Sequence, residues 1–315
     1  MDDSDDDRPK SNETSRGRKF ERLVNAHCQI SASRPVGDEI GFLCSSFIQF
    51  TLPHRAMSEH VLDRRNGNLQ VTFVAPPGIG LPYGKWVRLL LIHLTTQARR
   101  TKKREIDLGQ SISALLKLLC ASVSGGRNGS IQPFKRQLLR TTSLTASVSQ
   151  VPDVRGRVQN APLAGDLKIS WDVVDTDGRS GLPTTLRLGE GIFDQMLRSA
   201  VPLDMRAVQA VQQSPMALDI YAWSTYRAPR VAPTHAARIE WADLQAQFGS
   251  DYAAQSDFKI AFCSALRQVQ MVYPCLRVEV TGSHLLVWKS PPSVPRNVKP
   301  AGPSSFSVES NNHNG

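Results

Sequence analysis

The chain has 315 residues, of which 40% are hydrophobic and 21% charged, so most of its length can form packed cores. Its formal net charge of +10 and pI of about 9.6 indicate a polyanionic partner, nucleic acid first of all. No apolar run approaches the roughly 20 residues of a membrane helix, and the acidic N-terminus does not read as a signal peptide. The five cysteines share no Cys-x-x-Cys spacing, so we expect a cytoplasmic protein with free thiols and no zinc site.

The N-terminal residues 1–45 are expected to form a largely disordered tail. Residues 1–18 are polar, first acidic and then basic, and contain too few apolar side chains to build a core. Residues 46–52 and 69–74 alternate apolar and polar side chains, which predicts two strands. The sequence Arg-Asn-Gly-Asn at 65–68 predicts a turn before the second strand.

The excess positive charge of the chain lies in one short segment. Residues 85–140 hold twelve Lys and Arg but two acids, so their net charge of +10 equals that of the whole chain. A positive field concentrated on a helical unit is typical of a protein that binds duplex DNA. The elements predicted in this segment are a helix (85–98), a short strand (104–108), a helix capped by Ser111 (112–119), a Gly-rich turn (124–129) and a further helix (131–140).

The last of these helices has two distinct faces. At about 100° per residue, Ile131, Phe134 and Leu138 fall together and are expected to pack. The side chains nearly opposite them offer hydrogen-bond donors instead, as the DNA-facing side of a recognition helix must. They are Gln132, Arg136, Arg140 and Ser143.

Strands then follow at 144–148, 167–174 and 184–188, and helix, turn, helix, strands is the order of a winged helix-turn-helix. The second half repeats this order. Its expected elements are helices at 203–213, 215–226, 241–248 and 252–272, a strand at 237–240, and a hairpin of 276–280 and 284–288. The sequence predicts an α+β chain with two tandem winged-helix domains (46–200, with leading strands, and 201–289) between disordered tails (1–45 and the Pro-rich 290–315).

No motif for covalent chemistry stands out. Gly80 and Gly84 precede Lys85 as in a phosphate loop, but they are separated by three residues instead of four, and Trp86 replaces the hydroxyl that binds magnesium. A rigid turn leading into the helix at Lys85 is the preferred interpretation. The seven histidines contain no His-x-His pair, and no Gly-x-Ser-x-Gly elbow occurs. We therefore expect neither enzyme activity nor a cofactor or metal.

The basic run at 99–104 has two interpretations. It could merely stabilise the C-terminus of the helix before it, where cations are favourable. The second basic cluster, on and before the helix at 131–140, favours a role in clamping phosphates beside a groove-binding helix. In the second half the basic signal is thinner, and a plain amphipathic surface helix accounts for it about as well.

Several stretches also resemble the RepA-type plasmid replication initiators, over a region from about Phe47 to Trp288. In the first half they are Leu-Pro-Tyr-Gly-Lys (81–85), Arg-Leu-Leu-Leu (88–91), Arg-Thr (100–101), Glu-Ile-Asp-Leu-Gly (105–109) and Ser-Gly-Gly-Arg (124–127). In the second half they are Pro-Leu-Asp (202–204), Ser-Pro-Met-Ala-Leu-Asp-Ile-Tyr-Ala-Trp (214–223), Thr-Tyr (225–226), Trp241 with Leu244, Gln-Phe-Gly (247–249) and Asp-Phe (257–258). None of these motifs is catalytic.

The resemblance implies a bacterial, plasmid-encoded protein that binds repeated sequences at the plasmid origin and helps to melt the adjacent duplex. It also implies recruitment of the host initiator and replicative helicase, autorepression in many members, and a monomer–dimer equilibrium in some. The alternative is a winged-helix transcriptional repressor that binds only an operator. A nucleotide-hydrolysing or nicking enzyme is a distant third.

The residues expected to contact DNA divide between the two domains. Arg136 and Gln132 are predicted to reach base edges, with a helix of the second domain entering a neighbouring groove. The remaining cations and amides are assigned mainly to phosphates in the first domain and to the solvent face of helix 253–272 in the second. They are Arg99, Arg100, Lys102, Lys103, Arg104, Arg127, Lys135 and Arg140, and then Lys259, Arg267 and Gln270.

Overall fold

A computed structural model of the chain describes residues 10–67, 69–109, 111–119, 129–150, 171–176, 183–249 and 252–295. Within these residues, helices combine with small antiparallel sheets, which confirms the prediction of a mixed helix-and-sheet chain. One hydrophobic core runs through both halves of the sequence. The division into domains at residues 46–200 and 201–289 stays a prediction.

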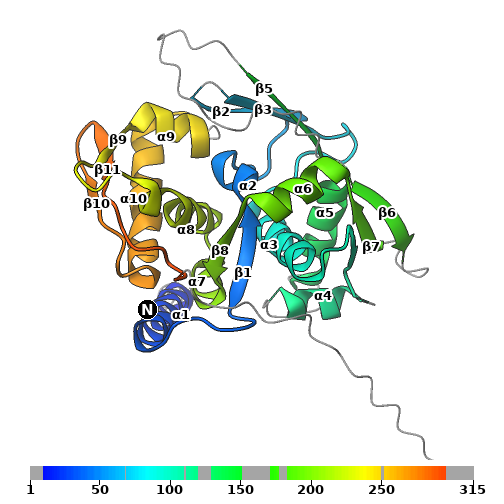
Figure 1. Ribbon diagram of the computed structural model, residues 1–315, viewed down its shortest axis with the longest axis horizontal. Helices are drawn as coiled ribbons and strands as arrows, with labels where there is room; N and C mark the ends of the chain where they lie inside the picture. Colours follow the sequence, from blue (N-terminus) through cyan, green and yellow to red (C-terminus); the bar gives the residue numbers. More distant parts are fainter. Residues whose placement is uncertain are drawn as a thin grey trace, which may run out of the picture.

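The N-terminal segment differs from the predicted tail. Residues Lys10–Ala32 form helix α1, which packs against α7 (Met205–Val211) and α10 (Gln255–Val272) at the lower left of Figure 1. Leu23 and Ala26 are buried, and the His27 Nδ1 lies 2.8 Å from the carbonyl oxygen of Met271. The polar composition of α1 hides this docking, because only a narrow apolar stripe is needed to hold a helix on a surface.

The chain next forms strand β1 (Ile40–Cys44), which pairs antiparallel with β8 (Ala200–Asp204), and then the short helix α2 (Ser45–Gln49). The strand predicted at 46–52 is therefore wrong. Phe47, Ile48, Phe50 and Leu52 are all buried, so the segment packs on several sides and its alternation of residue types does not mark a half-exposed strand.

The hairpin of β2 (Val61–Asn66) and β3 (Leu69–Val74) confirms the predicted turn, in which Gly67 adopts a φ of +61° that favours glycine. Its third strand is β5 (Thr145–Gln150), which pairs with β3 at the top of Figure 1. The strand predicted at 144–148 therefore exists, but it belongs to this separate sheet.

The first helical unit follows the predicted order. It comprises α3 (Gly84–Thr101), β4 (Glu105–Asp107), α4 (Ile112–Leu118), α5 (Ile131–Thr142), β6 (Trp171–Thr176) and β7 (Pro183–Leu188), with the three strands arranged β4-β7-β6. The Ser111 hydroxyl caps α4 by accepting a hydrogen bond from the Ala114 N–H at 3.1 Å. The helix α6 (Glu190–Arg198) then leads to β8.

The second helical unit repeats this order. It comprises α8 (Pro215–Arg227), the short 3₁₀ helix η1 (Ala228–Arg230), β9 (Ala237–Glu240), α9 (Trp241–Phe248), α10, β10 (Val278–Val280) and β11 (His284–Val287), with the strands arranged β9-β11-β10. At the end of α9, the ring of Phe258 from α10 lies so close to Gly249 that any side chain there would clash. The sheets of the two units lie at opposite sides of the molecule (Figure 1).

A buried ion pair joins the two units through their first helices. Arg88 of α3 donates to the two carboxylate oxygens of Asp219 of α8 at 2.7 and 2.5 Å, and His54 Nε2 lies 2.9 Å from that carboxylate. The other Arg88 N–H groups donate to the carbonyls of Leu52, Pro53 and Gly84. Burial raises the pKa of the Asp219 carboxyl, but Arg88 and His54 outweigh it, so the pKa lies below its usual value and Asp219 is ionised.

The C-terminal tail also begins later than predicted, because residues 290–295 pack on the fold. The hydroxyls of Tyr221 and Ser293 lie 2.7 Å apart, and Val294 is buried against Ile40 and Phe42 of β1. The apolar Val294 and the Ser hydroxyls supply these contacts within a Pro-rich sequence that reads as a linker.

Candidate nucleic-acid interface

The basic run after residue 98 lies at the last turn of α3, and its first two members are engaged within the fold. The Arg99 guanidinium donates to the Leu197 carbonyl at 2.8 Å and lies over the Phe42 ring. Arg100 pairs with Asp38 at 2.7 Å and donates to the carbonyls of Gly37 and Ile40, with 10% of its side chain exposed. Both arginines therefore hold α3 against its neighbours.

The positive charge of Arg100 also affects the pKa of His93, a buried residue of α3. Burial and, next to it, the positive charge of Arg100 lower the pKa of His93 to about 4. His93 is therefore neutral at pH 7 and adds nothing to the positive charge of α3.

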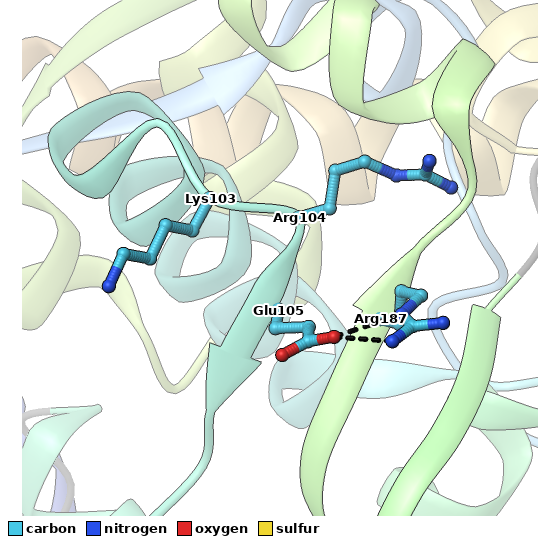
Figure 2. A pocket seen from close by; sticks show the side chains of 4 residues that line it. All are labelled: Lys103, Arg104, Glu105 and Arg187. Carbon is cyan, nitrogen blue, oxygen red and sulfur yellow. Dashed lines mark hydrogen bonds and ion pairs between the residues drawn. The ribbon is translucent and has the colours of Figure 1, made fainter.

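The other cations of the run face solvent. Lys102 ends α3 in the left-handed conformation, with a φ of +58°, and both Lys102 and Lys103 are exposed. Arg104 donates through Nε to the Leu188 carbonyl at 2.9 Å. Lys103 and Arg104 line an open depression of about 500 Å³ together with Glu105 and Arg187. Figure 2 shows that Glu105 and Arg187 pair across the strands, whereas Lys103 points away from them.

The helix α5 has the two faces that the sequence predicts. Phe134 and Leu138 are fully buried, and the Phe134 ring meets Trp86 of α3 edge to face at 5.5 Å. Gln132 and Arg136 are exposed, and Lys135 is half-buried. Gln132 and Arg136 are therefore open to a ligand.

Arg140 ties α5 to the segment before α3. Its guanidinium donates to the Leu81 carbonyl at 3.0 Å and lies over the Tyr83 ring at 5.0 Å. The buried amide oxygen of Gln137 accepts from the Tyr83 N–H at 2.8 Å. Gly80 and Gly84, with φ values of +80° and +77°, shape the turn that carries Tyr83.

The two basic clusters do not meet around α5. Trp86, which contacts α5, lies in the first turn of α3, and Arg100 lies fourteen residues later in its last turn. At about 1.5 Å of rise per residue, they are roughly 21 Å apart along the helix. The predicted phosphate contacts of residues 99–104 would therefore fall on a different part of the surface from those of α5.

In the second unit, Lys259 of α10 is engaged with the β10–β11 turn. Its ammonium donates to the carbonyls of Thr281 and Gly282 at 3.0 and 2.8 Å and lies over the Trp241 ring. The Trp241 indole N–H also donates to the Thr281 carbonyl, at 3.2 Å. Lys259 thus holds the hairpin turn against the N-terminal half of α10.

The open face of α10 carries the other two predicted residues, because Arg267 and Gln270 are exposed. Ile260 lies on the same face with 70% of its surface exposed, which sequence reasoning missed. Its position could have been read from the helical wheel, because Ile260 falls about 200° from the buried Phe258. Arg127 of the predicted set lies outside the described residues.

Other kinds of site are not evident in the part of the chain that the structure describes. There, no cluster of three or more His, Cys, Asp or Glu side chains has the arrangement of a metal site. No helix in the same part is long and apolar enough to cross a membrane.

The chain matches one known protein family over about half of its length. A family described as plasmid-encoded RepA protein matches residues 81–243, which include α3 to β9 and the first residues of α9. The chain belongs to this family of replication initiators. The match to the RepA family leaves out α1 and α10. A search of the curated proteins finds no match.

Among solved structures, the chain is similar to two crystal structures of domains 2 and 3 of RctB. The first, a selenomethionine derivative, has a TM-score of 0.46 and 12% identity, and the alignment covers 78% of this chain and 98% of that one. The second, described as RctB domains 2-3 (155–483), has a TM-score of 0.42 and 12% identity, with coverage of 77% and 96%.

Proposed function

We propose that this RepA family member initiates plasmid replication by binding repeated double-stranded sequences at the plasmid origin through two winged-helix units. The observation that carries the proposal is the repeated order of helix, strand, two helices and two strands. In both units the strands are arranged with the last strand in the middle, as β4-β7-β6 and β9-β11-β10. That arrangement supports the assignment of α5 and α10 as the two recognition helices.

The roles proposed for individual side chains draw on their charge and on their position on α5 and α10. In the first unit, Arg136 and Gln132 reach base edges, and Lys135 and Arg140 hold phosphates beside them. Lys102, Lys103 and Arg104 are the exposed members of the distant basic run, and they bind phosphates there. In the second unit, Arg267 and Gln270 face the groove, and Lys259 fixes the position of the hairpin turn.

The protein does this without covalent chemistry or a cofactor. Binding to the repeats promotes melting of an adjacent A·T-rich duplex, and the bound protein recruits the host initiator and the replicative helicase. Two unlike units in one chain suit asymmetric, directly repeated sites, whereas a repressor with one unit per chain would dimerise on a palindrome.

A footprint of the purified protein on the DNA that flanks its own gene tests this function. We expect several directly repeated protected blocks beside an A·T-rich stretch. A single protected inverted repeat over the promoter would identify a transcriptional repressor and would contradict the initiator proposal. ATP turnover or a covalent protein–DNA adduct would contradict the absence of enzyme activity.

A further inference from the structure

A pocket of about 410 Å³ lies between the end of α8 and the β2–β3 turn, and it is called the α8–β2 pocket below. One wall comes from the second unit, where Arg227 ends α8, Arg230 ends η1 and His235 lies in the loop before β9. The opposite wall includes Asn66 and Gly67 at the β2–β3 turn. The fold therefore brings together residues that are far apart in the sequence.

The lining of the α8–β2 pocket is positive. Arg227 and Arg230 are both exposed, and none of the described residues that line the pocket is acidic. The Arg227 guanidinium lies over the Trp223 ring at 5.9 Å and has no hydrogen-bond or ion-pair partner within the described part of the chain. Two cations in one concave place concentrate the positive field there. The lining therefore favours an anion as ligand.

Capping of α8 accounts for only one of these two arginines. Cations are favourable at a helix C-terminus, and the Arg230 guanidinium donates from one Nη to the Tyr226 carbonyl in the last turn of α8. The same guanidinium lies over the Tyr226 ring at 4.2 Å, which fixes its position at the pocket. A guanidinium has five N–H donors, so most of those of Arg230 stay available to a ligand. Arg227 donates to no carbonyl of the described residues.

The size and the remaining lining of the pocket indicate more than a lone inorganic ion. Sites for small molecules usually measure about 300–1,000 Å³ and are partly apolar. Leu69 of β3 and Val231 after η1 are buried side chains that line this pocket. Guanidinium groups bind phosphate oxygens in pairs. A molecule with a phosphate at one end and an uncharged body at the other fits both parts of the lining, and a nucleoside monophosphate is such a molecule.

We propose that the α8–β2 pocket binds a small phosphate-bearing molecule of about the size of a nucleoside monophosphate. Arg227 and Arg230 hold its phosphate, and Leu69 and Val231 contact its body. The bound molecule contacts both the β2–β3 hairpin and the second unit, so it stabilises the packing of one on the other. The proposal involves no covalent step and does not depend on the proposed function.

Thermal unfolding of the full chain with adenosine monophosphate tests the proposal, with sodium chloride of equal ionic strength as the reference. A ligand that binds only the folded state raises the unfolding temperature, by about 4 °C at roughly one hundred times its Kd. Adenosine, which lacks the phosphate, should give a much smaller rise. Equilibrium dialysis of the unaltered chain against adenosine monophosphate measures the Kd directly and does not depend on the folding of any variant.

The double variant Arg227→Gln, Arg230→Gln should abolish the rise. Without ligand it should unfold close to the temperature of the unaltered chain, because both side chains are exposed. Arg238→Gln is the matched control and should keep the full rise, because Arg238 is an exposed arginine of β9 that does not line the pocket.

Two outcomes would overturn the proposal. One is that adenosine monophosphate does not bind the unaltered chain, or that it stabilises the double variant equally. The other is that the small molecule has no effect and the double variant instead flattens the salt dependence of DNA binding. The two arginines would then contact DNA phosphates, and the proposed function would stand without a small-molecule site.

Discussion

The two helical units share one order of elements but differ in the charge of their third helix. The helix α5 carries Lys135, Arg136 and Arg140 and no acid, whereas α10 carries Asp257 beside Lys259 and Arg267. Lys259 is moreover engaged with the hairpin turn of its own unit. Under the proposed function, the same topology would supply mainly affinity for DNA in the first unit and mainly shape and discrimination in the second.

The units also differ in how their sheets are built. In the second unit the chain passes from α10 directly to the β10–β11 hairpin. In the first, the chain leaves α5 to form β5, which extends the β2–β3 hairpin, before it returns to β6 and β7. The chain of the first unit therefore also contributes a strand to the sheet of β2, β3 and β5. The chain of the second unit passes from its third helix straight into its own sheet.

The largest expected effect comes from removing the contact that the two units share. Arg88→Ala leaves the buried carboxylate of Asp219 without its main partner, and breaking a buried pair in this way costs about 3–5 kcal/mol. The free energy of unfolding from denaturant titration measures the loss. The exposed Lys117→Ala should change it by less than about 0.5 kcal/mol. A loss of similar size in both variants would show that the pair does not hold the units together.

A smaller change in free energy, this time of DNA binding, should distinguish base contacts from phosphate contacts in the first unit. Arg136→Ala should lose about 1–3 kcal/mol of discrimination between origin and random DNA. Lys102→Ala should weaken binding to both by the same factor and flatten the salt dependence. Competition binding with the two DNAs distinguishes these outcomes. Equal losses on both DNAs for both variants would show that Arg136 is not a base-reading residue.

The smallest effect tests whether the second unit discriminates through shape and apolar contact. Ile260 is 70% exposed on the open face of α10, and an aliphatic side chain in a major groove contacts the methyl group of thymine. Ile260→Ala should cost about 1 kcal/mol on origin DNA. Replacing thymines singly by deoxyuridine should reproduce that loss at one position. Removing the methyl group at that position should not weaken binding by the Ile260→Ala variant any further. If the losses from the variant and from the deoxyuridine were additive, Ile260 would not contact that methyl group.

Helix and strand positions could largely be predicted from the sequence, because apolar spacing and caps act locally. The Ser111 cap of α4 and the apolar face of α5 are examples. The docking of α1 could not, because Leu23 and Ala26 give a stripe too narrow to distinguish from a polar tail. The pairing of β5 with β3 could not either, because strand partners depend on packing far along the chain.

The candidate site was predictable in residue type but not in arrangement. The run at 99–104 and the cations of α5 read as one surface along the sequence, but the length of α3 holds them apart. Arg99 and Arg100 are engaged with Leu197 and Asp38, which lie far from them in sequence.

Under the proposed function, the buried pair of Arg88 and Asp219 fixes the distance between the two DNA segments that the protein contacts. With the first helices of both units fixed to each other, α5 and α10 keep one separation and one relative direction. DNA must then match the protein in the spacing of its contacted segments as well as in their bases. If a plasmid origin gained or lost half a helical turn between those segments, the protein could no longer contact both of them at once. Binding would then be lost although the contacted sequences themselves were unchanged.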